Sequence, residues 1–401
     1  MDAIWFELTI SMGCGDEFDW LAWFDLIWFD LIWFDLIWFD LILILILILI
    51  LIGFDLIWFD LNWIDFDLIW FDLIWFFHVF ILITITKFQS NNQQPFRQRP
   101  LNQQLRLGTG KQGSANGEFY LPWGIVFDSK NQRVIVSDNN HRLQLFNRHD
   151  LTHLLSVGSW GTSLGQFNYP SGLCIQPSTN HLLICDDYAH RVQVWSVDDD
   201  KVQPIYSIGR TDQPSDAKGE FNRPFGVCCS PDGSFSVVEH SNHRVQRFDA
   251  SGRFLTKFGS EGENEDQFEN PYYFCHLHRH FSPSSSASSL LLVTDHYNNR
   301  LSIWSGDSHQ HITNIQMKGQ PRGVCVDLNG FVNVSCDLPH VVCIYDPRKS
   351  YQLLQTLGYG YGSALGQFNC PTDMCVDDLN ILMVVDYFNH QVQFFDWLFD
   401  W

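Results

Sequence analysis

The chain has 401 residues, with 24 Lys and Arg against 45 Asp and Glu, and a formal net charge of −21 at pH 7. This length allows two or three domains with a large core. An acidic chain repels phosphate backbones, so the composition disfavours non-specific nucleic-acid binding and leaves RNA binding only to a local basic patch.

The first segment, residues 1–86, is a low-complexity tract. It holds fourteen Asp and Glu and no Lys or Arg, so the remaining residues carry only −7 of the net charge. Phe-Asp-Leu-Ile-Trp recurs every five residues, a period that fits neither a helix face nor strand alternation, and we therefore expect disorder. Two alternatives stay open. Residues 36–86 contain apolar windows that can insert into a membrane and leave the following domain in the cytosol, or the tract is a gene-model artefact.

Residues 87–100 are polar and rich in Gln and Asn, which indicates a linker. From residue 101 to 397 the chain repeats a Gly-x-Phe-x-x-Pro-x-Gly element. The six anchor prolines lie 47 to 54 residues apart at Pro122, Pro170, Pro224, Pro271, Pro321 and Pro371. Each repeat contains four short apolar or alternating runs bounded by turn residues, which predicts four antiparallel strands. We therefore expect an all-β fold, a six-bladed β-propeller, over residues 101–397.

The sixth repeat ends after three predicted strands. The run Leu105–Gly110 precedes the first repeat and matches the outer strands of the other repeats. We therefore expect this N-terminal strand to complete the last blade and to close the ring.

A second motif follows each anchor and contains an acidic residue, then His and Arg. Because it recurs once per repeat, we interpret it as structural: the acidic residue starts the turn between the second and third strands, and the Arg binds a carboxylate or carbonyls. The residues assigned to this role are Asp138, His141, Arg142, Asp186, His190, Arg191, Glu239, His243, Arg244, Asp295, Arg300, Asp386 and His390. The fifth copy, with Pro339 and Val341, is degenerate and predicts the weakest blade.

The copies Asn140-His-Arg-Leu143 and Asn242-His-Arg-Val245, together with Gly-Gln-Phe-x-x-Pro, resemble the NHL repeat. The resemblance covers about three quarters of the chain and implies a propeller. NHL propellers serve as substrate- or RNA-binding domains of tripartite-motif ubiquitin ligases, as sensors, and in an amidating lyase, so the fold alone assigns no function. Residues 1–100 contain one cysteine, Cys14, and one histidine, His78, so the zinc modules of such ligases are not expected here.

Positions that differ between repeats are the candidates for ligand binding. The residues directly after the anchor prolines are expected to ring one mouth of the channel, and four residues of the second motif are expected next to them. These candidates are Trp123, Ser171, Phe225, Tyr272, Arg322, Thr372, Tyr188, His240, Tyr297 and Phe388. Aromatic residues and Arg dominate binding hot spots, so this set suits a peptide or another extended ligand.

Catalytic and metal-binding patterns are weak. The eleven cysteines show no Cys-x-x-Cys spacing and lie partly in apolar runs, which indicates reduced, buried thiols. His276, His278 and His280 alternate, but they border a Ser-rich insertion that favours a solvated strand end. We expect a monomeric, cytoplasmic, non-catalytic scaffold that binds a protein or peptide, without a cofactor or metal. One form of it is substrate recognition in a ubiquitin-ligase-type system, and the alternatives are a metal-dependent lyase or hydrolase, or an RNA-binding propeller.

Overall fold

The computed structural model describes residues 106–198, 201–278 and 289–396. The expectations for the tract 1–86 and the linker 87–100 lie outside these residues. The described helices are the short 3-10 turns η1 (Asp187–Ala189), η3 (Pro347–Lys349) and η4 (Tyr387–Asn389). Within the described part of the chain, no helix is long and apolar enough to cross a membrane.

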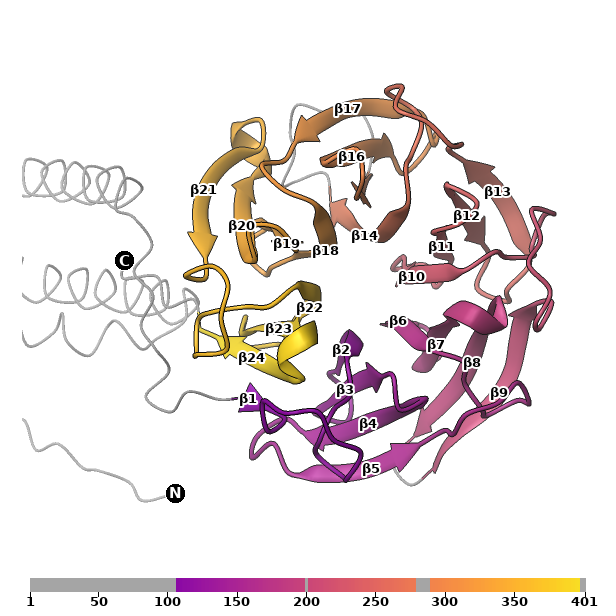
Figure 1. Ribbon diagram of the computed structural model, residues 1–401. Coiled ribbons are helices and arrows are strands. Elements are labelled where there is room, and N and C mark those ends of the chain that lie inside the picture. The colour runs from indigo at the N-terminus through magenta and orange to yellow at the C-terminus, as the bar shows by residue number, and fades with distance from the viewer. Residues whose placement is uncertain (1–105, 199–200, 279–288, 397–401) are drawn as a thin grey trace, which may run out of the picture. The chain divides into compact units, whose positions relative to one another are not determined.

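The described strands form six four-stranded antiparallel sheets arranged around one axis, which confirms the predicted six-bladed propeller (Figure 1). Every innermost strand begins at an anchor proline. These strands are β2 (Pro122–Asp128), β6 (Pro170–Ile175), β10 (Pro224–Cys229), β14 (Pro271–His278), β18 (Pro321–Val326) and β22 (Pro371–Val376). Blades 1 to 6 are numbered in this order.

The second and third strands of each blade flank the turn that carries the second sequence motif. The second strands are β3 (Arg133–Asp138), β7 (His181–Asp186), β11 (Phe235–Glu239), β15 (Ser289–Asp295), β19 (Val332–Cys336) and β23 (Leu382–Asp386). The third strands are β4 (Arg142–Asn147), β8 (Arg191–Asp198), β12 (Arg244–Phe248), β16 (Arg300–Ser305), β20 (Val341–Asp346) and β24 (Gln391–Phe395).

The outermost strands form the rim of the ring in Figure 1. They are β5 (His153–Val157), β9 (Lys201–Gly209), β13 (Phe254–Phe258), β17 (His311–Gln316), β21 (Gln352–Leu357) and, for blade 6, β1 (Arg106–Leu107). Strand β1 pairs antiparallel with β24, with Leu107 opposite Val392, so the predicted closure is confirmed. Closure removes the free edge that an open ring would expose.

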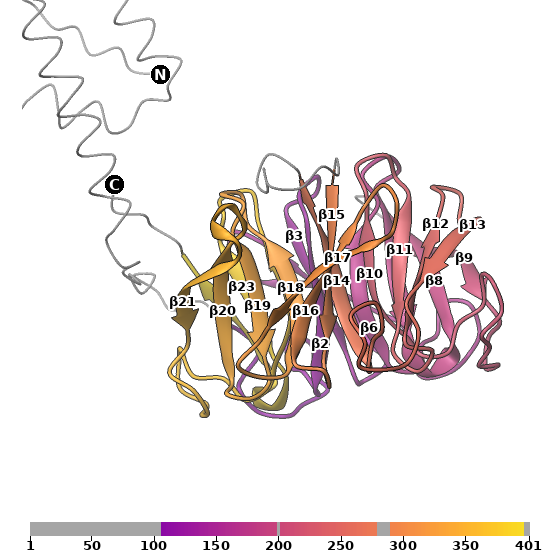
Figure 2. The same ribbon diagram turned by 90° about the horizontal axis from the view of Figure 1, so that it is seen from above.

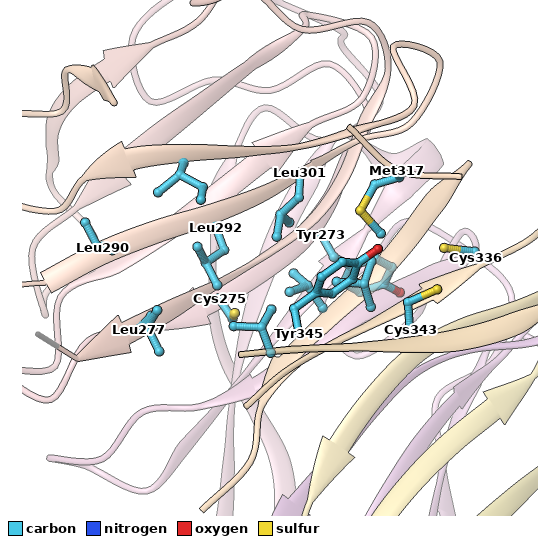
Figure 3. Close-up of a cluster of buried hydrophobic side chains, with 14 of the residues drawn as sticks. Tyr273, Cys275, Leu277, Leu290, Leu292, Leu301, Met317, Cys336, Cys343 and Tyr345 are labelled. Atoms are coloured by element: carbon cyan, nitrogen blue, oxygen red, sulfur yellow. The ribbon is translucent and has the colours of Figure 1, made fainter. Parts of the chain in front are cut away.

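The core lies between neighbouring blades, whose sheets stand side by side around the axis (Figure 2). Blades 4 and 5, for example, bury Leu292, Leu301, Tyr345 and other apolar residues against each other (Figure 3). The closing strand contributes in the same way, because Leu107 is only 3% exposed and packs with Val392 and Phe119. Each blade is therefore stabilised mainly by its two neighbours.

Each inner strand starts with a bulge that brings it close to the next blade. The residue two positions after the anchor proline is glycine in four blades, and a Cβ on Gly124 would lie 2.1 Å from the Ser171 carbonyl oxygen of blade 2. Blades 4 and 6 carry Tyr273 and Asp373 at this position instead. Blades 4 and 6 therefore place a side chain in the channel at a position where the other four blades have none.

Candidate ligand-binding mouth

Neighbouring strands of a blade are antiparallel, so two sets of connections lie at the same edge of the blades. One set joins each outer strand to the next blade, and the other joins each second strand to the third. We call this edge the mouth face and the opposite edge the far face. The inner strands start at the mouth face with the anchor prolines. The turns of the second motif, which contain η1 and η4, lie on the mouth face as well.

The arginines of the second motif are buried and hold loops of their own blade. Arg191 binds Asp186 with its Nε at 2.9 Å, and its guanidinium donates to the carbonyls of Thr162, Ser163 and Gln166. The acid–arginine pairs Asp138–Arg142, Glu239–Arg244 and Asp295–Arg300 repeat this arrangement. In blade 6 Asp386 accepts hydrogen bonds from three side-chain amides instead, those of Asn389, Gln391 and Gln393.

The histidines of the second motif join blades 1, 2, 3, 5 and 6 each to the next blade, whereas blade 4 carries Asn299 at this position. Nδ1 of His190 accepts the backbone N–H of Arg223 at 3.1 Å, and Nδ1 of His390 accepts that of Leu121 across the ring closure. His141 and His243 make the same contact, and so does His340 in the degenerate fifth copy. Burial lowers the pKa of His141, His190 and His390, which favours the neutral imidazole that this acceptor role requires.

The fifth copy lacks an arginine in its second motif, because Val341 stands at that position. Its acidic residue, Asp337, binds Arg322 at the start of β18 instead, with Nε at 2.8 Å and Nη2 at 2.6 Å from the same carboxylate oxygen. The Arg322 guanidinium lies over the ring of Tyr272 at 5.0 Å and over that of Trp123 at 5.5 Å. Burial lowers the pKa of Arg322, but Cys370, Tyr272 and Asp337 together raise it above that of an ordinary arginine, so this residue is a fixed cation.

Trp123 closes the mouth of the channel. Although it belongs to blade 1, its ring lies 4.9 Å from Phe225 of blade 3, 6.4 Å from Tyr272 of blade 4 and 4.4 Å from Tyr387 of blade 6. A side chain that contacts blades 3, 4, 5 and 6 has to lie at the axis. We call Trp123, Phe225, Tyr272 and Arg322 the aromatic plug.

The remaining two residues that directly follow anchor prolines do not belong to the plug. Ser171 and Thr372 are buried, with exposed fractions of 1% and 0%. Their hydroxyls donate to backbone carbonyls of neighbouring blades, Ser171 to Phe225 at 3.0 Å and Thr372 to Trp123 at 3.1 Å. The expectation that all six positions face a ligand is therefore wrong for these two, because a small hydroxyl side chain here binds the backbone of the next blade. Phe225 of the plug is also buried, with an exposed fraction of 2%.

The second-motif candidates surround the plug. Tyr188, Tyr297 and Phe388 are each about half exposed, at 48%, 50% and 51%. His240 is more buried and packs on Tyr272 of the plug at 5.0 Å. We call Tyr188, Tyr297 and Phe388 the outer aromatic ring.

The two arginines at the mouth, Arg223 and Arg322, are each paired with a carboxylate. Arg223 binds Asp187 through two hydrogen bonds of 2.9 and 2.8 Å and lies over the ring of Tyr188 at 4.5 Å. Burial, together with the nearby Arg223 and Arg322, lowers the pKa of His240 to about 3, and His296 has a pKa of about 4 for similar reasons. At neutral pH the surroundings of the plug are therefore aromatic with paired charges, whereas the connection before β14 adds the exposed acidic residues Glu261, Glu263, Glu265 and Asp266 to the mouth face.

Tyr273 and Asp373, which replace glycine two positions after the anchor proline, lie in the channel beneath the plug. The hydroxyl of Tyr273 donates to the Trp123 carbonyl at 3.4 Å. Asp373 accepts the backbone N–H groups of Ile125 and Met374, and burial raises its pKa to about 7. Among the described residues, no group of three or more His, Cys, Asp or Glu is arranged to hold a metal ion.

Sequence reasoning missed several exposed aromatics of the mouth face. Trp160, Tyr359 and Tyr361 lie in the connections before β6 and β22 and are exposed by about 70%. Tyr169, directly before an anchor proline, packs against Tyr188 at 5.2 Å. Their positions in the repeat, close to the anchor, were the available signal.

Of the histidine run, His276 bonds to Ser230, whereas His280 lies outside the described residues.

The fold defines this chain as a six-bladed β-propeller, and its mouth face carries exposed aromatic side chains. The chain matches the NHL repeat family over residues 167–195, which confirms the predicted resemblance. It is 26% identical over 151 residues to the protein brain tumor of Drosophila melanogaster, which covers 37% of this chain and 13% of that protein. RING finger protein nhl-1 of Caenorhabditis elegans is 38% identical over 52 residues, 13% of this chain and 5% of that protein.

Enzymes also appear among the similar proteins. Peptidyl-glycine alpha-amidating monooxygenase B of Xenopus laevis is 28% identical over 162 residues, 38% of this chain and 17% of that protein. A solved structure of catalytically inactive virginiamycin B lyase from Staphylococcus aureus with quinupristin shares 13% identity, at a TM-score of 0.47 over 74% of this chain and 89% of that one. The matches to the curated relatives thus span less than a fifth of each relative.

Proposed function

We propose that this chain is a non-catalytic scaffold that binds a protein or peptide on its mouth face. The observation that carries the proposal is the outer aromatic ring, whose side chains are each about half exposed. Tyr297 and Phe388 are linked to the plug through the rings of His296 and Tyr387. Large aromatic side chains on a preformed surface supply contact area at low entropic cost and dominate binding hot spots.

The charges favour a peptide over a polyanion. Arg223 and Arg322 are each held by a carboxylate, so neither offers its full charge to a phosphate. RNA binding needs several cations that release counterions on binding. An aromatic surface with paired charges instead suits an extended peptide whose apolar side chains fill the spaces between rings.

We propose a cytoplasmic, monomeric protein, and substrate recognition in a ubiquitin-ligase-type system, with the ligase on another chain, is one form of the function. The relative named RING finger protein nhl-1 is compatible with that form. The rival proposal is a metal-dependent lyase or hydrolase. The amidating monooxygenase relatives favour it, whereas the filling of the channel by Tyr273 disfavours it.

The test is selection of peptides from a displayed random library against the full chain. We expect enriched peptides to bind the wild type and to lose at least tenfold in affinity to a variant with Tyr188→Ala, Tyr297→Ala and Phe388→Ala, because truncating hot-spot aromatics costs about 1–2 kcal/mol each. The matched control is Leu328→Ser with Leu379→Ser, two exposed residues of the far face. Peptides that bind the triple variant equally, or a random RNA pool that binds more tightly than any peptide, would refute the proposal.

A further inference from the structure

Cysteines recur at one position of the inner strands. The fourth residue after the anchor proline is Val126 in blade 1 and cysteine in the other five blades: Cys174, Cys228, Cys275, Cys325 and Cys375. The strand register confirms that these positions are equivalent, since each cysteine pairs with the residue three before the last residue of the second strand. Because the inner strands run away from the mouth face, these thiols lie toward the far end of the channel.

One pair of thiols meets across a blade boundary. The backbone N–H of Cys229, the next residue after Cys228, donates to Sγ of Cys174 at 3.1 Å, which brings Cys174 Sγ next to Cys229. Cys174 and Cys229 pack against the same core cluster between blades 2 and 3. Cys228 also contacts Cys174, but it packs against the core between blades 3 and 4, as strand alternation requires.

Small molecules can reach this end of the channel. A pocket of about 390 Å³ is lined by Cys228, Cys229, Cys275 and Cys325, together with prolines of two far-face loops. Cys174 and Cys229 are free thiols and are both partly exposed. Of the pair, Cys229 lines the pocket and Cys174 lies beside it, whereas Cys185 is fully buried.

We propose that Cys174 and Cys229 form a disulfide between blades 2 and 3 when the protein meets a low-molecular-weight disulfide. The Cys229 thiolate attacks one reagent sulfur, the reagent S–S bond breaks, and one reagent thiol leaves. The Cys174 thiolate then attacks Cys229 Sγ and releases the second reagent thiol. The two protein thiols lose two electrons and two protons, and the two reagent thiols gain them.

The reaction is slow at neutral pH. The hydrogen bond with Cys228 lowers the pKa of Cys174, but the contact with Cys229 and burial raise it, and the result is well above that of an ordinary thiol. A small thiolate fraction slows attack on a disulfide. The test therefore uses hours of incubation at about pH 8.5 rather than minutes at pH 7.

The experiment incubates the full chain with oxidised glutathione, then digests it without reduction and maps linked peptides by mass spectrometry. We expect a linked pair carrying Cys174 and Cys229, two hydrogens lighter than the separate peptides and lost on reduction. The variants C174S and C229S should lack it, and the matched variant C228S should retain it. A second expected readout is a higher Tm of the oxidised than of the reduced wild type, absent in C174S, because the link constrains the unfolded chain.

Glutathione adducts without a linked pair would overturn the proposal, because they would place the two sulfur atoms out of reach of each other. A link from Cys174 to Cys228 that persists in C229S would also overturn it. Neither result would affect the proposed peptide-binding function, which involves the opposite face.

Discussion

Arg322 and Asp337 form an ion pair in blade 5 that replaces the acid–arginine pair found within the second motif of blades 1 to 4. The substitution that makes the fifth copy degenerate, Val341 in place of Arg, leaves the Asp337 carboxylate available to a residue of the mouth. The carboxylate thereby fixes Arg322 against Trp123 and Tyr272. The loss of a structural residue in one repeat thus accompanies the construction of the plug.

This pair predicts a strong coupling in a double-mutant cycle. The single variants Arg322→Met and Asp337→Ala should each lower the free energy of unfolding by about 2–4 kcal/mol, because each leaves a desolvated charge without its partner. The double variant should lose at least about 1 kcal/mol less than the two single losses added together. Urea unfolding measures all four proteins. Additive losses would show that Asp337 does not hold Arg322.

The closing strand predicts a large effect of one short side chain. Leu107→Ala should destabilise the propeller by about 2–4 kcal/mol, since Leu107 is 3% exposed and packs in the core between blades 6 and 1. Leu154→Ala on outer strand β5 is the matched control, because Leu154 is 48% exposed and should cost less than about 0.5 kcal/mol. Chemical unfolding compares the two. Equal effects would contradict closure through β1.

His240 predicts a loss of stability in acid. Its pKa is about 3 in the folded protein and 6.5 as an ordinary group, so the unfolded chain binds a proton first as the pH falls. The contribution of His240 to the free energy of unfolding is fully present above pH 6.5. Protonation of this residue in the unfolded chain lowers that free energy by about 2 kcal/mol at pH 5. His240→Phe keeps the ring contact with Tyr272 but cannot titrate. Its advantage over the wild type should therefore grow by this amount between pH 6.5 and 5, and parallel curves would refute the assignment.

Asp373 predicts the opposite pH dependence. Its folded pKa of about 7 lies above the ordinary value of 3.8, so its contribution to stability is present below pH 3.8 and is lost as the pH rises through 7. Asp373→Asn removes this titration. The unfolding free energy of the variant, relative to that of the wild type, should increase between pH 4 and 7 and stay constant above pH 8. An unchanged difference would mean that Asp373 ionises normally in the folded protein.

The repeat and its closure were predictable because they follow from local periodicity. Each anchor proline starts an inner strand, and the run near Arg106 supplies the missing outer strand, as expected. The repeat predicted the position of each residue around the mouth only in part. Trp123, Ser171 and Thr372 occupy the same repeat position, yet one fills the axis and two bind the backbone of the next blade. The size of the side chain decides this, and sequence position alone does not reveal it.

The sequence by itself determined the number of blades and the strand that closes the ring. Hydrophobic alternation and turn residues are local signals, and six copies of them average out individual irregularities. Only the tertiary structure decided that Arg322 binds Asp337, that Trp123 spans the axis, and that Cys174 meets Cys229. Those contacts join different strands or blades, and their partners are chosen by the radial packing of the sheets rather than by neighbours along the chain.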